Sequence, residues 1–109
     1  MTLEEYQADV LRTMNPSLGT DKEAMAYYAM GVSREASEAG DEVIKYIGQG
    51  HILDKDHIAE ELGDTLWFLV AYAHKLGYTL NDIMNRNVDK RQHRYPDGFE
   101  IEKSVNRNK

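Results

Sequence analysis

Apolar residues recur along the chain at intervals of three and four, the spacing that places side chains on one face of an α-helix. The pattern falls into four stretches separated by short polar or glycine-containing connections. We therefore predict helices over residues 2–14, 21–47, 55–76 and 79–93. Short connections favour antiparallel neighbours, so the sequence predicts an all-α fold that resembles a four-helix antiparallel bundle.

The expected helix starts carry recognisable capping residues. Thr2, Thr20 and Thr79 each stand three positions before an acidic residue, the spacing of a capping box. Asp54 is a suitable N-cap for the third helix. Residues 100–109 are polar with few apolar anchors, so we expect one domain over 1–99 followed by a polar C-terminal tail.

Two glycines interrupt the second predicted helix. Gly31 and Gly40 should each weaken it by roughly 1 kcal/mol relative to alanine. Glycine at such positions indicates either a close contact with a neighbouring helix or a local kink.

The third predicted helix is apolar on nearly all sides, which implies burial on nearly all sides. A small bundle cannot supply that much cover, so we expect this helix to face a partner subunit in a homo-oligomer. One apolar stripe consists of Ile58, Leu62, Leu66, Leu69, Ala73 and Leu76. Further apolar side chains lie on the other faces, and they are Trp67, Phe68, Val70 and Tyr72.

Composition narrows the possible functions. The 109 residues carry a formal net charge of −6, which disfavours binding to nucleic acid or to an anionic membrane surface. The absence of cysteine excludes disulfides, thiolate metal sites and cysteine nucleophiles. No apolar run approaches a membrane span and no signal pattern opens the chain. We expect a soluble cytoplasmic protein.

Two pairs of acidic residues are the main candidates for chemistry. Glu35 and Glu38 lie on the second helix, and Glu61 and Asp64 lie on the third. Three-residue spacing places each pair on one helix face, at the edge of the apolar stripe. If the helices pack side by side, four carboxylates meet, and hard oxygen ligands suit Mg²⁺ or Mn²⁺ together with phosphate oxygens. Either pair alone would more commonly be a solvated helix face.

Other chemistry is less well supported. Di-iron bundles use Glu-x-x-His, which the sequence lacks. The four histidines are scattered, and we expect them at the surface or at helix ends. A basic face on the fourth helix would suit phosphates beside the acidic site. It comprises Asn87, Lys90, Arg91 and Arg94. Lys45 extends the acidic line of the second helix and is a candidate partner of Asp41 or Glu42.

The motifs together resemble the MazG-like, all-α nucleoside triphosphate pyrophosphohydrolases. Glu35-Ala-Ser-Glu38 and Glu61-Leu-Gly-Asp64 are similar to the family's Glu-x-x-Glu and Glu-x-x-Asp signature, and Gly31 precedes the first glutamate as in the family. Residues 62–69, LGDTLWFL, and 87–99, NVDKRQHRYPDGF, resemble its later motifs. In many relatives a second glutamate precedes the first pair, whereas this chain has Arg34 there.

The resemblance implies Mg²⁺-dependent hydrolysis between the α and β phosphates of a nucleoside triphosphate, by a dimer or tetramer. It implies that Glu35, Glu38, Glu61 and Asp64 hold the metal. By matching position, phosphate and sugar contacts would come from Lys45, Asn87, Lys90 and Arg94. Base recognition is expected from aromatic groups near the site, such as Trp67, Phe68 or Tyr6. Two alternatives are phosphoribosyl-ATP pyrophosphohydrolase-like activity and a non-catalytic helical module that binds metal or nucleotide.

Overall fold

The computed structural model describes residues 1–107 and confirms the all-α class. All four predicted helices are present, each with ends within one residue of the prediction. A fifth, short helix follows them in the described residues. The elements are α1 (Leu3–Thr13), α2 (Asp21–Gly48), α3 (Lys55–Lys75), α4 (Leu80–Arg94) and α5 (Ile101–Val105).

The predicted N-caps are formed. In each of the first four helices a side-chain oxygen accepts a hydrogen bond from a backbone N–H three residues later. That N–H belongs to the first turn, where it has no partner within the helix. The capping residues are Thr2, Thr20, Asp54 and Thr79.

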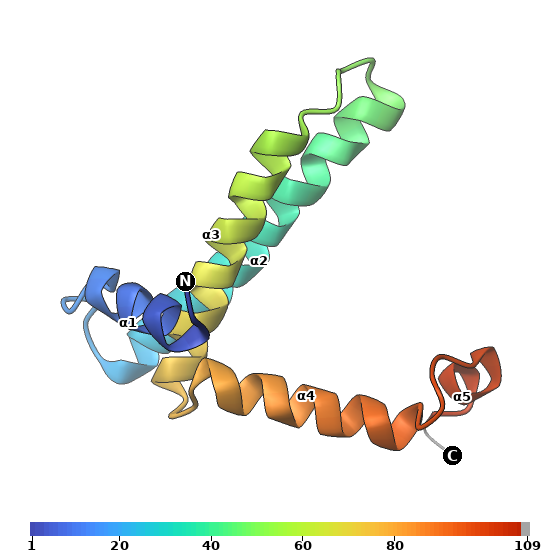
Figure 1. The fold of residues 1–109 in the computed structure, drawn as a ribbon. Helices are drawn as coiled ribbons and strands as arrows, with labels where there is room; N and C mark the ends of the chain where they lie inside the picture. Colours follow the sequence, from blue (N-terminus) through green and yellow to red (C-terminus); the bar gives the residue numbers. More distant parts are fainter. Residues whose placement is uncertain (108–109) are drawn as a thin grey trace.

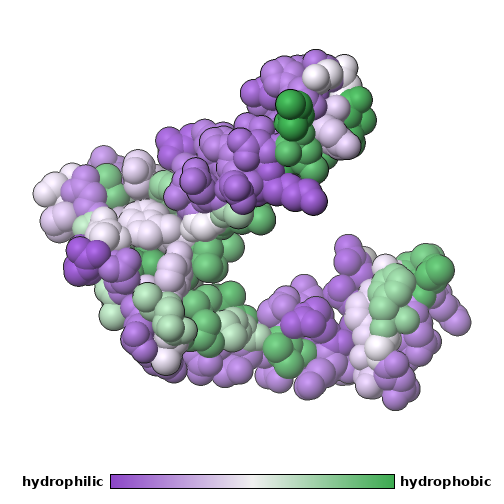
Figure 2. Space-filling view, turned by 45° about the horizontal axis from the view of Figure 1, so that its top comes forward, coloured by the Kyte–Doolittle hydropathy of each residue, from purple (hydrophilic) through white to green (hydrophobic). Residues whose placement is uncertain are grey.

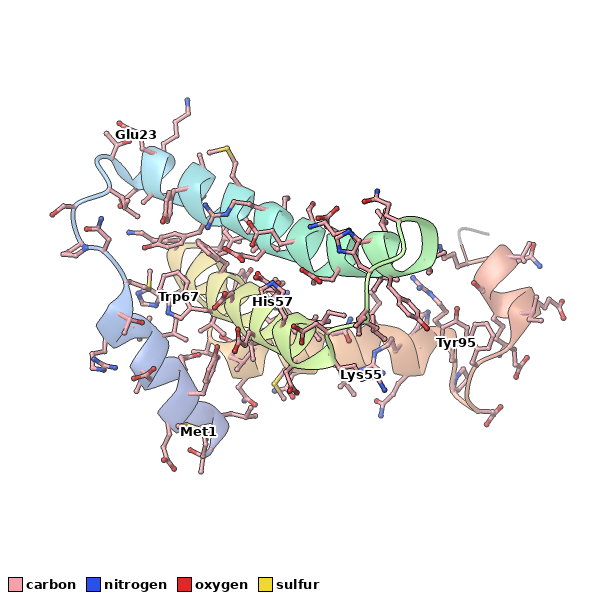
Figure 3. The ribbon with its side chains drawn as sticks, turned by 90° about the horizontal axis from the view of Figure 1, so that it is seen from above. Met1, Glu23, Lys55, His57, Trp67 and Tyr95 are labelled. Carbon is pink, nitrogen blue, oxygen red and sulfur yellow. The ribbon has the colours of Figure 1, made fainter. Side chains whose placement is uncertain are left out.

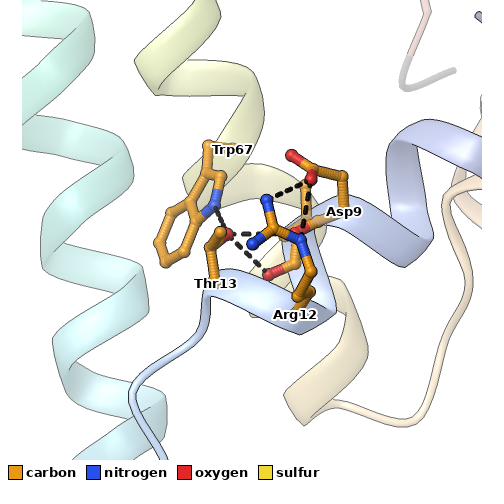
Figure 4. Close-up of polar contacts among 5 residues, drawn as sticks. Asp9, Arg12, Thr13 and Trp67 are labelled. Atoms are coloured by element: carbon orange, nitrogen blue, oxygen red, sulfur yellow. Dashed lines mark hydrogen bonds and ion pairs between the residues drawn. The ribbon is translucent and has the colours of Figure 1, made fainter.

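The main packing unit is an antiparallel hairpin of α2 and α3, which lie side by side along their length (Figure 1). The start of α2, the second half of α3 and the end of α1 meet in the core. Its fully buried large side chains are Val10, Tyr28 and Val70. Trp67 Nε1 donates a hydrogen bond to Thr13 Oγ1 at 2.8 Å, which fastens α1 to α3 (Figure 4).

The fourth helix departs from a closed bundle. It begins beside the end of α3 and then runs away from the hairpin (Figure 1), and none of its residues is buried. The radius of gyration is 17.1 Å, whereas a compact chain of this length has roughly 13 Å. The chain therefore encloses an open concavity between the hairpin and α4, with apolar side chains along it (Figure 2).

The C-terminal segment, expected as a polar tail, contains α5, and residues 108 and 109 of that tail lie outside the described residues. Across residues 1–107, no helix combines the length and apolarity that a bilayer span requires.

The two glycines of α2 have different surroundings. A Cβ added at Gly31 would overlap the ring of Phe68 on α3, so this glycine permits close helix contact. A Cβ added at Gly40 would meet nothing within 4 Å. Of the two explanations, the structure therefore supports close contact between α2 and α3 at Gly31.

We expect Gly31→Ala to lower the free energy of unfolding by about 1–3 kcal/mol, because the Phe68 ring must move in a packed environment. Gly40→Ala is the matched control on the same helix and should raise it by about 0.5–1 kcal/mol, since alanine favours the helix and meets open space. Urea denaturation of both variants measures the difference. Equal effects of the two substitutions would contradict the packing described.

Candidate metal and substrate site

The hairpin brings three of the four predicted carboxylates together. Glu35 and Glu38 from α2 and Glu61 from α3 each offer one oxygen, and these oxygens lie within 4.8 Å of one another. The three-residue spacing places the first two on one face of α2. The antiparallel packing of α3 then places Glu61 opposite them, as the sequence predicted.

Glu35 is the most buried of the three, with an exposed fraction of 7%. Arg34 Nη2 donates to Glu35 Oε1 at 2.7 Å. This hydrogen bond lowers the pKa of the Glu35 carboxyl, against the opposing effect of burial, so Glu35 remains ionised. Helical spacing alone does not predict this contact, because neighbouring residues on a helix seldom face one another.

The pKa of the Glu61 carboxyl is shifted in the opposite direction. Burial, with further contributions from the nearby Glu38 and Glu35 carboxylates, raises the pKa of Glu61 from its usual 4.5 to about 7. Its Oε2 atom is buried and has no hydrogen-bond partner within the described part of the chain. Three carboxylates that each offer a hard oxygen donor, together with this unpaired buried oxygen, fit a divalent cation such as Mg²⁺ or Mn²⁺.

His57 closes one end of the acidic cluster. Its Nε2 atom lies 3.4 Å from a carboxylate oxygen of Glu42 and 3.4 Å from one of Glu61. Figure 3 shows the side chain between the two long helices. We expected His57 to be a surface or capping residue, although its four-residue spacing from Glu61 could have revealed this contact.

Asp64 lies one turn further along α3, outside the group of three. Its side chain is near Tyr6 of α1, whose phenol has a raised pKa because of burial, then the charges of Asp9 and Asp64. The described structure therefore separates the fourth predicted carboxylate from Glu35, Glu38 and Glu61. Its assignment as a metal ligand stays a prediction.

The predicted basic residues do not contact the carboxylates in this copy of the chain. Lys45 Nζ pairs with Asp41 at 3.0 Å, one of its two expected partners. On α4, Arg91 donates to Asn87 at 2.8 Å. Lys90 and Arg94 line a hollow of about 710 Å³ between α4 and α5. Among the described residues, no ion pair joins α4 to the acidic cluster.

The aromatic candidates have different exposures. Phe68 is buried in the core cluster, and Trp67 and Tyr6 are partly buried and pack against it. The Trp67 indole is already bonded to Thr13. Phe68 also borders a cleft with Tyr27, a residue that the sequence analysis did not single out. A role in base recognition for Trp67 stays a prediction.

Comparison with known proteins identifies relatives. Residues 23–99 match the MazG nucleotide pyrophosphohydrolase domain. The chain is also 33% identical over 76 residues to the Gene 37 protein of Mycobacterium phage L5, covering 66% of this chain and 67% of the phage protein. No solved structure matches. The matched range includes α3, α4 and most of α2, and therefore all four predicted carboxylates.

The raised pKa of Glu61 predicts how stability depends on pH in metal-free solution. The folded chain keeps the Glu61 proton up to about pH 7, whereas the unfolded chain releases it near pH 4.5. The folded state therefore binds more protons between these values, and the Glu61 contribution to stability is lost as pH rises from about 4.5 through 7. Glu61→Gln, which is neutral throughout, should remove this part of the slope.

Urea denaturation in EDTA between pH 5 and 8 measures the effect. Glu60→Gln is the matched control, because Glu60 is the exposed neighbour, and its slope should follow wild type. Identical slopes for wild type and Glu61→Gln would show that Glu61 does not hold a proton at neutral pH.

Proposed function

The chain belongs to the MazG nucleotide pyrophosphohydrolase family, and we propose that it hydrolyses a nucleoside triphosphate between the α and β phosphates. The products are the nucleoside monophosphate and pyrophosphate. The observation that carries this proposal is the acidic group Glu35, Glu38 and Glu61, with a buried, unpaired oxygen on Glu61. Such a group suits Mg²⁺ bound between the protein and substrate phosphates, with Mn²⁺ as a substitute.

Each residue has a distinct part in this proposal. Bound Mg²⁺ would neutralise the triphosphate and lower the pKa of a bound water. Glu35, Glu38 and Glu61 would hold the cation, and Asp64 would join them from the next turn of α3. Arg34 keeps Glu35 ionised and oriented through the 2.7 Å hydrogen bond. A carboxylate that does not itself ligate the cation would accept a proton from the attacking water.

We also propose that the protein works as a homo-oligomer, a dimer or a tetramer. The accessible surface is 8254 Å², whereas a compact monomer of 12.5 kDa has roughly 6,200 Å². The difference between these two surface areas exceeds the roughly 1,600 Å² that a standard interface buries. Leucines on α3 and at its C-cap leave 39–57% of their surface exposed, and they are Leu62, Leu66, Leu69 and Leu76.

Assembly would also allow the basic face of α4 to bind the substrate phosphates. In one copy α4 runs away from the hairpin (Figure 1), so its cations stand apart from the acidic cluster. A second copy packed against the concavity would bring basic residues toward the substrate phosphates. We propose this role for Asn87, Lys90, Arg91 and Arg94, with Lys45 contributing from α2.

The activity predicts release of pyrophosphate from at least one member of a panel of ribo- and deoxynucleoside triphosphates, and only with a divalent cation. Glu38→Gln should lower kcat/KM by at least about 100-fold, because losing even an outer-sphere group at a metal site costs about 10- to 100-fold. Mass spectrometry of the products distinguishes pyrophosphate from phosphate. Phosphoribosyl-ATP belongs in the panel.

Glu60→Gln serves as the control, since it changes an exposed acid next to the cluster and should retain wild-type activity. Circular dichroism of both variants establishes that the fold survives. Saturable nucleotide binding without any product would instead indicate a non-catalytic binding module.

If the chain forms a homo-oligomer, light scattering should give a particle mass of at least twice 12.5 kDa. Replacing Leu66 and Leu69 together with glutamate should yield monomers, because two charges would be buried in an apolar interface. Ile52→Glu is the control, because Ile52 is 90% exposed in the loop between α2 and α3. A monomeric wild-type protein at micromolar concentration would contradict the proposal.

A further inference from the structure

A cleft of about 210 Å³ opens on the hairpin close to the acidic cluster. It is lined by Tyr27, Met30, Gly31 and Arg34 of α2 and by Phe68 of α3. The missing Cβ of Gly31 makes room for the Phe68 ring. The cleft therefore depends on the same close helix contact that sets the spacing of the hairpin.

The cleft and the carboxylates are neighbours along the same pair of helices. Gly31 precedes Glu35 by four residues on α2, and Phe68 follows Glu61 by seven residues on α3. Because the helices are antiparallel, both offsets lead toward the same end of the hairpin, by one to two turns of about 5.4 Å each. Arg34 joins the two sites, since it lines the cleft and donates to Glu35 at 2.7 Å.

The lining has the chemistry of a site for a flat aromatic group. The Tyr27 and Phe68 rings lie 5.9 Å apart between centroids at an angle of 52°, and the Arg34 guanidinium carbon lies 5.7 Å from the Phe68 centroid. Tyr27 is 44% exposed and Met30 is 66% exposed, so both are available to a ligand. Aromatic rings and arginine are the groups on which nucleobases stack.

The volume of the cleft suits only one part of a nucleotide. Pockets for whole drug-sized ligands measure about 300–1,000 Å³, so 210 Å³ suits a single ring system. The guanidinium of Arg34 offers five N–H donors, and among the described residues its one hydrogen bond is to Glu35. Donors therefore remain for acceptor atoms on the edge of a base.

We propose that this cleft binds the base of the nucleotide, packed against Tyr27 and Phe68, with Arg34 donating to the base edge. This inference rests on the proposed nucleotide chemistry, and it identifies the part of the chain that distinguishes a nucleotide from a simple polyphosphate. The phosphates then extend along the hairpin to the carboxylates.

Isothermal calorimetry with the full chain tests the cleft without turnover. The probes are a panel of ribo- and deoxynucleoside monophosphates and, separately, inorganic pyrophosphate, each with Mg²⁺. Tyr27→Leu should weaken binding of the best monophosphate about 5- to 150-fold, the range for loss of one base–aromatic stack. It should leave pyrophosphate affinity within about twofold of wild type, because pyrophosphate has no base.

Tyr46→Leu is the matched control, since Tyr46 is a half-exposed tyrosine of α2 outside the cleft, and it should bind both probes as wild type does. Phe68→Leu provides a second variant from α3, with circular dichroism to verify its fold. Light scattering of Tyr27→Leu should give the wild-type mass.

Several results would overturn the inference. These are unchanged monophosphate affinity in Tyr27→Leu, equal weakening of both probes, no monophosphate binding by wild type, or a change of mass that makes the cleft a subunit contact. The inference and the proposed function can fail separately. Tyr27-dependent binding without hydrolysis of any triphosphate would retain the cleft and reject the enzyme, whereas hydrolysis with Tyr27-independent binding would do the reverse.

Discussion

The confinement of three carboxylates between two long helices is the constraint on which the site depends. Like charges within 4.8 Å repel, and partial burial strengthens the repulsion because less water screens them. The metal-free chain relieves this repulsion in two ways. Arg34 bonds to Glu35, and Glu61 keeps a proton up to about pH 7. A divalent cation would replace the Glu61 proton and add its charge to that of Arg34.

The hairpin tolerates the repulsion among the carboxylates because its stabilising apolar core lies to one side of the acidic cluster. Tyr28, Val70 and Val10 are fully buried where α1 crosses α2 and α3, and Phe68 extends this core toward the acids. The same ring contacts the core, the backbone of Gly31 and the cleft. Structural packing and the proposed base recognition would therefore share one residue, which restricts what can replace Phe68 without affecting both.

The open shape follows from how little a chain of this size can bury by itself. Small domains have a high ratio of surface to volume, and here the apolar faces of α3 and α4 remain largely without cover in one copy. Oligomerisation would cover these faces and bring cations to the acidic cluster. Stability and phosphate binding would then depend on the same subunit contact.

Local rules predicted the helices well, because caps and apolar periodicity are encoded within a few residues. They also predicted the meeting of Glu35, Glu38 and Glu61, since spacing fixes the face of each helix. They could not predict that α4 leaves the hairpin, because periodicity identifies an apolar face but not what covers it. The Arg34–Glu35 contact depends on side-chain conformations, and the separation of Asp64 depends on how the two helices pack.

Binding of a divalent cation by the acidic group can be measured by Mn²⁺ titration followed by electron paramagnetic resonance at pH 7.5. We expect saturable loss of the free Mn²⁺ signal with wild-type protein, competition by Mg²⁺, and at least about 10-fold weaker binding in Glu61→Gln. Equal Mn²⁺ affinity in wild type and Glu61→Gln, or no binding by wild type at millimolar Mn²⁺, would contradict cation binding by the acidic group.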